Sequence, residues 1–88
     1  MRENPKLRED LVTREVESEF LVYDPETGEI YLLNGTAAGI AEMCDGTTPV
    51  ADIVAEIVEV FGADPAQVAA DVESALADLR AKGLLEEG

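Results

Sequence analysis

Two apolar runs separated by a turn dominate the pattern of the first half of the chain. The runs cover residues 20–23 and 30–33, and the segment between them reads DPETG at residues 24–28. Proline holds φ at about −65° and glycine accepts a positive φ, so this segment is expected to reverse the chain direction. The pattern therefore predicts an antiparallel hairpin.

The predicted hairpin carries apolar side chains on both faces. The expected register pairs Tyr23 with Ile30 and Leu21 with Leu32 on one face, and Val22 with Tyr31 and Phe20 with Leu33 on the other. A hairpin that packs through one face only would alternate apolar with polar residues. The second face is therefore either covered by another element or kept for a partner, and the pattern leaves both alternatives open.

A further strand is predicted before the hairpin. Residues 11–19 alternate, with Val12, Arg14 and Val16 against Thr13, Glu15 and Glu17. This alternation is typical of a half-exposed strand and gives a three-stranded antiparallel meander. The strand at residues 29–33 then lies at an edge, where its outer backbone groups lack partners. Residues 1–10 contain Pro5 and show no periodicity, so we expect an irregular N-terminal arm followed by a single domain over residues 11–88.

Three amphipathic helices are predicted in the second half. The first covers residues 37–44, the second has Thr48 as its N-cap with Pro49 at its first position, and the third begins with Asp64 as its N-cap. Their apolar stripes are Ile40, Met43 and Cys44 in the first helix, Val50, Ile53, Val54, Ile57, Val58 and Phe61 in the second, and Val68, Val72, Ala75, Leu76 and Leu79 in the third. Leu84 and Leu85 are expected to fold back and close the core. The predicted fold is α+β and resembles a winged helix-turn-helix, with a three-stranded antiparallel sheet followed by three helices.

The charge of the chain argues against nucleic-acid binding, which this shape would otherwise suggest. There are 20 acidic and 6 basic residues, a net charge of −14, and no lysine or arginine from Glu15 through Leu79. Binding to nucleic acid requires cations that neutralise phosphates, so we predict no nucleic-acid partner. The acidic surface is expected to aid solubility, and attraction to a basic partner is the alternative.

Residue usage also argues against catalysis and metal binding. The chain has no histidine and one cysteine, Cys44, which excludes an intramolecular disulfide, the usual zinc sites and histidine-based triads. Cys44 falls on an apolar stripe and is expected to be an inert thiol. We predict no enzyme activity and no cofactor. The start of the chain does not resemble a secretory signal and no run is apolar enough for a membrane span, so a cytoplasmic protein without a membrane partner is expected.

The edge strand and the last helix form the remaining candidate site. An extended peptide can add to residues 29–33, gain backbone hydrogen bonds and place alternate side chains between the strand and the helix. A homodimer that pairs its own edge strands is the alternative.

Several motifs resemble those of the pyrroloquinoline quinone biosynthesis protein D family, over about residues 5–86. The motifs are residues 31–38 (YLLNGTAA), residues 44–46 (CDG) followed by Thr48, Val50, Ile53 and Val54, and then Asp71, Val72, Leu79, Gly83 and Leu84. Their order and spacing carry the resemblance.

The resemblance implies a recognition element for precursors of ribosomally made, post-translationally modified peptides (RiPPs). Members of this family resemble winged helices, lack catalytic residues and bind the leader segment of a precursor as an added strand. They present it to a maturation enzyme, often a radical S-adenosylmethionine enzyme or, in lasso-peptide pathways, a leader peptidase. The peptide-binding positions that the resemblance implies here are Glu29, Ile30, Tyr31, Leu32 and Leu33 on the strand and Val68, Asp71, Val72 and Ala75 on the helix.

Overall fold

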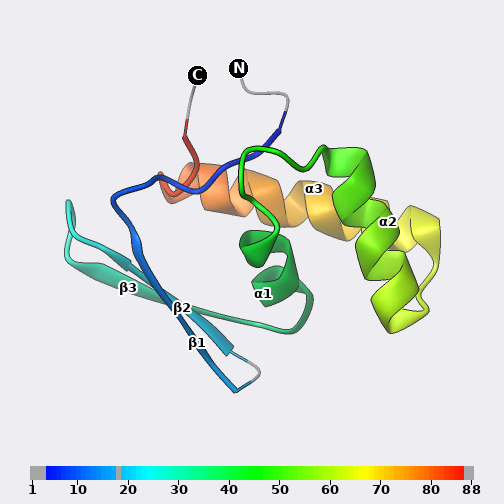
Figure 1. Cartoon of the computed structure of the whole chain (residues 1–88), viewed down its shortest axis with the longest axis horizontal. Helices are drawn as coiled ribbons and strands as arrows, with labels where there is room; N and C mark the ends of the chain where they lie inside the picture. Colours follow the sequence, from blue (N-terminus) through cyan, green and yellow to red (C-terminus); the bar gives the residue numbers. More distant parts are fainter. Residues whose placement is uncertain (1–3, 18, 87–88) are drawn as a thin grey trace.

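A three-stranded antiparallel sheet precedes three helices in the computed structural model, which describes residues 4–17 and 19–86 (Figure 1). The strands are β1 (Val12–Val16), β2 (Glu19–Asp24) and β3 (Glu29–Asn34), and the helices are α1 (Gly35–Glu42), α2 (Val50–Phe61) and α3 (Pro65–Ala81). This element order confirms the predicted α+β fold class.

The turn between β2 and β3 sets the predicted register. The backbone N–H of Gly28 donates to the Asp24 carbonyl at 2.8 Å. Gly28 has a φ of 77°, which glycine adopts without the steric cost of a Cβ atom. The pairs Tyr23–Ile30, Leu21–Leu32, Val22–Tyr31 and Phe20–Leu33 are all present. The strand order β1-β2-β3 places β3 at an edge, as the sequence predicts.

One face of the sheet packs on α1, and α2 and α3 complete the core. Phe20 and Val22 are buried on this face. The other buried apolar residues are Ala38, Ile40, Ala41, Cys44, Ile53, Ile57, Val68, Val72, Leu76, Leu79, Leu84 and Leu85. The last two confirm that the C-terminal segment folds back onto the core.

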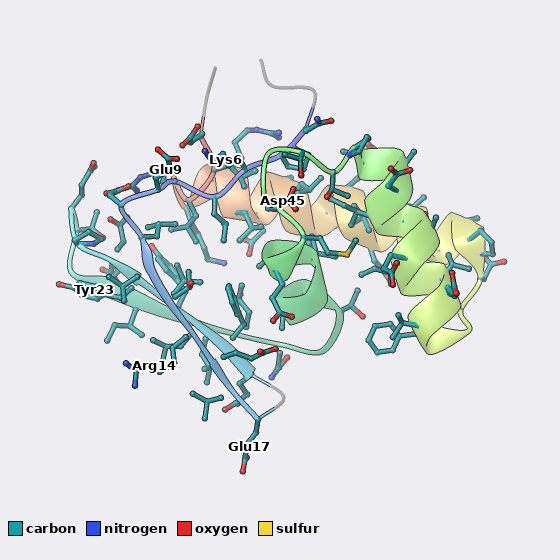
Figure 2. The ribbon with its side chains drawn as sticks, viewed as in Figure 1. Lys6, Glu9, Arg14, Glu17, Tyr23 and Asp45 are labelled. Atoms are coloured by element: carbon teal, nitrogen blue, oxygen red, sulfur yellow. The ribbon has the colours of Figure 1, made fainter. Side chains whose placement is uncertain are left out.

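The opposite face of the sheet is open to solvent. Its exposed apolar side chains are Val12, Val16, Tyr23, Ile30 and Leu32. Figure 2 shows Arg14 and Tyr23 projecting from the sheet away from the helices. Among the described residues, no helix covers this face. The second apolar face of the hairpin is therefore not covered by another element of the described chain.

The helix starts agree with the sequence in one case and differ in another. At α3, the Asp64 carboxylate accepts a hydrogen bond from the Gln67 N–H at 3.1 Å, which confirms the predicted N-cap. At α2, the N-cap is Pro49 and not the predicted Thr48. The reason is that the Thr48 hydroxyl donates to Asp45 at 3.1 Å and so belongs to the preceding turn. The helix α1 begins and ends two residues before the predicted range 37–44.

The apolar stripe of α2 is less buried than predicted. Ile53 and Ile57 are buried, and Val50, Val54 and Val58 are half-buried against the core. Phe61, which the periodicity assigns to the core, is 58% exposed. It is the last residue of α2, and its ring lies at a surface pocket where no described element covers it.

The described part of the N-terminal arm is bonded to the rest of the protein. The backbone N–H groups of Leu7 and Arg8 donate to the carbonyls of Cys44 and Leu84, at 3.0 and 2.9 Å. Leu7 also forms an isolated antiparallel bridge with Leu85, so the described part of the arm and the segment after α3 lie side by side (Figure 1). The division into an arm at residues 1–10 and a domain at residues 11–88 stays a prediction.

Candidate functional site

The strand β3 has a free edge that a further strand can use. It pairs with β2 on one side, and within the described chain no strand pairs with its other side. Every second N–H and C=O group of an edge strand points outward without a ladder partner. Ile30 and Leu32 are 61% and 57% exposed, whereas Tyr31 and Leu33 are half-buried against the core. The edge therefore offers both backbone groups and apolar contacts.

The edge strand does not pack directly on the last helix. Among the described residues of the two elements, no Cα atom of α3 lies within 8 Å of a Cα atom of β3, although α1 contacts both. The Lys82 ammonium lies 5.6 Å from the centre of the Tyr31 ring, a cation–π distance. Lys82 also forms an ion pair with Asp78. Tyr31 and Lys82 thus connect the edge strand to the end of α3 through their side chains.

A groove lies between α1 and α3, and α1 begins directly after β3. We call it the α1–α3 groove. Its volume is about 310 Å³, and its lining residues are Thr36, Ala37 and Ile40 on α1 and Asp71, Ser74, Ala75 and Asp78 on α3. The Gln67 amide donates to the Asp71 carboxylate at 3.0 Å and holds it at the rim. The groove therefore combines small apolar and polar side chains, with the carboxylates on its α3 side.

The structure divides the predicted helix positions into two groups. Asp71 and Ala75 line the α1–α3 groove. Val68 and Val72 are 3% and 0% exposed and belong to the core, so a peptide in the groove does not reach their side chains in this conformation. The reason is that residues 68 and 72 share the stripe that packs inward, whereas residues 71 and 75 lie on the next face of the helix.

Five further groove residues were not predicted from the sequence: Thr36, Ala37, Ile40, Ser74 and Asp78. Asp78 follows Asp71 by seven residues, which places both on one face of α3, so helical spacing could have found it. The sequence does not indicate that α1 residues line the groove, because this depends on which helices pack side by side in the folded protein.

A comparison with protein families matches residues 19–85 to the family described as coenzyme PQQ synthesis protein D, or PqqD. The chain belongs to the PqqD family.

Solved structures show the same fold. The structure described as TbiB1 in complex with the TbiA(beta) leader peptide superposes with a TM-score of 0.86 at 23% identity, over 94% of this chain and 96% of that one. A lasso peptide synthetase B1 complexed with the leader peptide gives a TM-score of 0.84 at 19% identity, over 96% and 99% of the two chains. At these identities the likeness establishes the fold.

A third structure is itself a PqqD. It is the solution NMR structure of the PqqD truncation of Methylobacterium extorquens PqqCD, described as a functional, stand-alone RiPP recognition element. It is 28% identical and superposes with a TM-score of 0.76, over 94% of this chain and 88% of that one. A comparison with curated proteins gave no match.

The CDG motif of this PqqD-family chain has a structural role. One Asp45 oxygen accepts hydrogen bonds from the backbone N–H groups of Thr47 and Thr48, at 2.8 and 3.0 Å, and the two threonine hydroxyls also donate to it. These bonds, first among them the one from the Thr47 N–H, lower the pKa of Asp45. Gly46 has a φ of 84°, and a Cβ atom there would lie 2.9 Å from the Lys6 side chain. The motif therefore fixes the turn between α1 and α2 under the arm.

The thiol of this PqqD-family protein lies in the core. Cys44 is buried, and burial raises the pKa of its thiol to about 12, so it stays protonated at neutral pH. Its Sγ lies 3.2 Å from the Ile40 carbonyl. Among residues 4–17 and 19–86, no group of three or more potential ligand residues is arranged to hold a metal ion. No helix formed by these residues is long and apolar enough to cross a membrane.

Proposed function

We propose that this protein is a non-catalytic adaptor that binds the leader segment of a RiPP precursor and presents it to a maturation enzyme. The observation that carries the proposal is the free edge of β3, together with the α1–α3 groove next to it along the chain. Two structures with the same fold are complexes with leader peptides, and the PqqD from Methylobacterium extorquens is described as a recognition element. Each of these likenesses supports leader binding by this chain.

The leader is expected to bind as a fourth strand. Its backbone pairs with residues 29–33, and its side chains alternate between the two sides of the extended sheet. Those on the helix side enter the space bounded by Tyr31 and the α1–α3 groove, with Asp71 and Ala75 as contacts on α3. Those on the other side lie beside the exposed Ile30 and Leu32 and remove apolar area from water.

The partner enzyme supplies the chemistry in this proposal. A bound leader raises the local concentration of the precursor at the enzyme, so modest affinity for each partner suffices. The candidate partners are a radical S-adenosylmethionine enzyme and a leader peptidase. The proposed adaptor itself needs no cofactor, works in the cytoplasm and contacts neither nucleic acid nor membrane.

Alternate N-methylation of the leader tests strand addition directly. The probe is a synthetic leader of the precursor encoded beside the gene, titrated into ¹⁵N-labelled protein. We expect amide shifts at residues 29–33 and on α3 around Asp71 and Ala75. Because only every second N–H of an added strand points to β3, N-methylation should weaken binding at alternate leader positions. Equal effects at adjacent positions, or shifts confined to other parts of the chain, would refute the proposal.

A homodimer paired through β3 is the second candidate. The exposed Ile30 and Leu32 favour it, because an apolar edge strand readily pairs with another copy. Sedimentation velocity at several concentrations distinguishes the two. A monomer supports the adaptor, and a dimer that persists on dilution and in the presence of leader supports the homodimer.

A further inference from the structure

A second hollow lies away from the proposed leader site. It is bounded by the end of the β1–β2 hairpin, by α1 and by α2, and we call it the α2 pocket. Its volume is about 280 Å³, and no residue of β3 or α3 is among its lining residues. Figure 2 shows Glu17, one of its lining residues, at the tip of the hairpin, far from the end of the molecule that carries Lys6 and Glu9. The α2 pocket and the α1–α3 groove therefore share no lining residue.

The floor of the α2 pocket is apolar. Phe20 and Ile57 reach it from the core, and Met43 adds a flexible thioether side chain. Val60 and Phe61 form the wall on α2 and are 65% and 58% exposed. Two large apolar side chains left exposed beside a hollow are typical of a surface that is covered on binding. The volume is large enough for a side chain of leucine or phenylalanine size.

The rim of the α2 pocket is acidic. Its five carboxylates are Glu15, Glu17, Glu19, Glu42 and Glu56, and no lysine or arginine is among the lining residues. Interaction with the neighbouring Glu15 raises the pKa of Glu42, so these two carboxylates repel each other when both are charged. A cation placed between them would relieve this repulsion. The pocket thus combines an apolar floor with a negative field at its mouth.

We propose that the α2 pocket docks an apolar side chain of a partner protein that is flanked by lysine or arginine residues. The apolar side chain fills the hollow, and the flanking cations meet the glutamate rim. A second copy of this chain is a poor occupant, because its net charge is −14. Identifying the partner as the maturation enzyme rests on the proposed function. The apolar floor and acidic rim of the α2 pocket are independent of that function.

Three synthetic six-residue peptides test the site on ¹⁵N-labelled full-length protein. They are capped at both ends and read RRFLRR, RRGGRR and EEFLEE. We expect RRFLRR alone to give saturable amide shifts at Gly39, Val60 and Phe61. Equal shifts with RRGGRR would mean general attraction to an acidic protein, and shifts centred on α3 or β3 would mean a different site. Either result, or no shift with RRFLRR, overturns the proposal.

Matched variants separate the pocket from the acidic surface as a whole. Phe61→Ser and Glu56→Gln change the pocket, whereas Val12→Ser and Glu59→Gln remove an exposed apolar group and a carboxylate elsewhere. Phe61→Ser should weaken RRFLRR binding by about tenfold, and Glu56→Gln by a few-fold. The two controls should bind as the wild type does. Equal loss in the variants and their controls would contradict the assignment.

The same variants distinguish failure of this inference from failure of the proposed function. Leader affinity is measured in parallel by fluorescence anisotropy and should be unchanged in Phe61→Ser, because Phe61 lies neither on β3 nor in the α1–α3 groove proposed for the leader. The affinity for the maturation enzyme encoded beside the gene should fall about tenfold in Phe61→Ser but not in Val12→Ser. If Phe61→Ser and Val12→Ser bind the enzyme with equal affinity, the docking role is refuted, even if both variants still bind the leader. If the wild-type protein binds RRFLRR at the α2 pocket but does not bind the leader, the adaptor role is refuted. The proposal that the α2 pocket is a docking site then still stands.

Discussion

The Arg8 guanidinium and the Asp24 carboxylate form a two-point ion pair, with Nη1 3.0 Å from Oδ2 and Nη2 3.1 Å from Oδ1. Arg8 also donates to the Gly83 carbonyl at 2.9 Å, and the Glu26 N–H donates to Asp24 at the same distance. The pair therefore ties the N-terminal arm, the β2–β3 turn and the segment after α3 at one point. Because this turn starts β3, the ion pair also supports the edge proposed to bind the leader.

Asp24→Asn should destabilise the fold at neutral pH. The hydrogen bond from Arg8 lowers the pKa of Asp24 more than burial raises it, so the folded protein holds the charged form. A lowered folded pKa contributes stability above the unfolded pKa, and this contribution disappears as pH falls through the folded pKa. Thermal unfolding followed by circular dichroism should show a lower Tm for the variant at pH 7 and convergence with the wild type in acid. The exposed Asp52→Asn serves as the control, and an equal loss of Tm in both variants would contradict the prediction.

Glu42→Gln should have the opposite effect and raise stability at neutral pH. Interaction with Glu15 raises the pKa of Glu42 in the folded protein, so the charged form is disfavoured there. The cost is present above the folded pKa and vanishes below the unfolded pKa, where the residue is protonated in both states. Urea unfolding at pH 7 and in acid measures the gain and its loss. Glu59→Gln, on the exposed face of α2, should show less gain.

Truncations on α2 test where its core ends. Ile53 is fully buried, so Ile53→Ala should cost about 2–5 kcal/mol of unfolding free energy. Phe61→Ala should cost much less, about 0.5 kcal/mol or below, because its ring is already exposed in the folded state. Urea denaturation of both variants gives the comparison. A large loss for Phe61→Ala would mean that this ring is part of the core.

The local features of the fold were predictable from the sequence because short segments determine them. The turn at residues 24–28 fixes the hairpin register, and the Asp64 cap needs only its own backbone and Gln67. Thr48 was misassigned because its hydroxyl bonds to Asp45, a competing partner in the preceding turn. Phe61 was misassigned because periodicity gives the direction of a side chain but not whether another element covers it.

The candidate site was only partly predictable for the same physical reason. The edge position of β3 follows from the order of the meander, which is a local property. The groove depends on how α1 packs against α3, a contact that no spacing along the chain encodes. Helical spacing identifies Asp71 and Ala75 as neighbours of the buried stripe, but only the packed structure shows that they line a groove and that Val72 does not.

Filling the α1–α3 groove should block the leader without unfolding the protein. Ala75 is half-buried on the groove wall, so the ring of Ala75→Phe would project into the space proposed for leader side chains. Ala77 is exposed and does not line the groove, which makes Ala77→Phe a matched control on the same helix. We expect Ala75→Phe to weaken leader binding by about tenfold or more, because a steric clash removes packed contacts at the centre of the site. Ala77→Phe should bind as the wild type does.

Fluorescence anisotropy with a labelled leader measures both affinities, and circular dichroism checks that both variants remain folded. Equal affinity of the two variants would exclude the α1–α3 groove from the binding surface. The β3 edge would then have to act alone, and its backbone hydrogen bonds would give affinity with little selection among leader side chains. A leader with its helix-side residues changed to alanine would then bind as tightly as the native one, whereas contact with Ala75 predicts a clear loss.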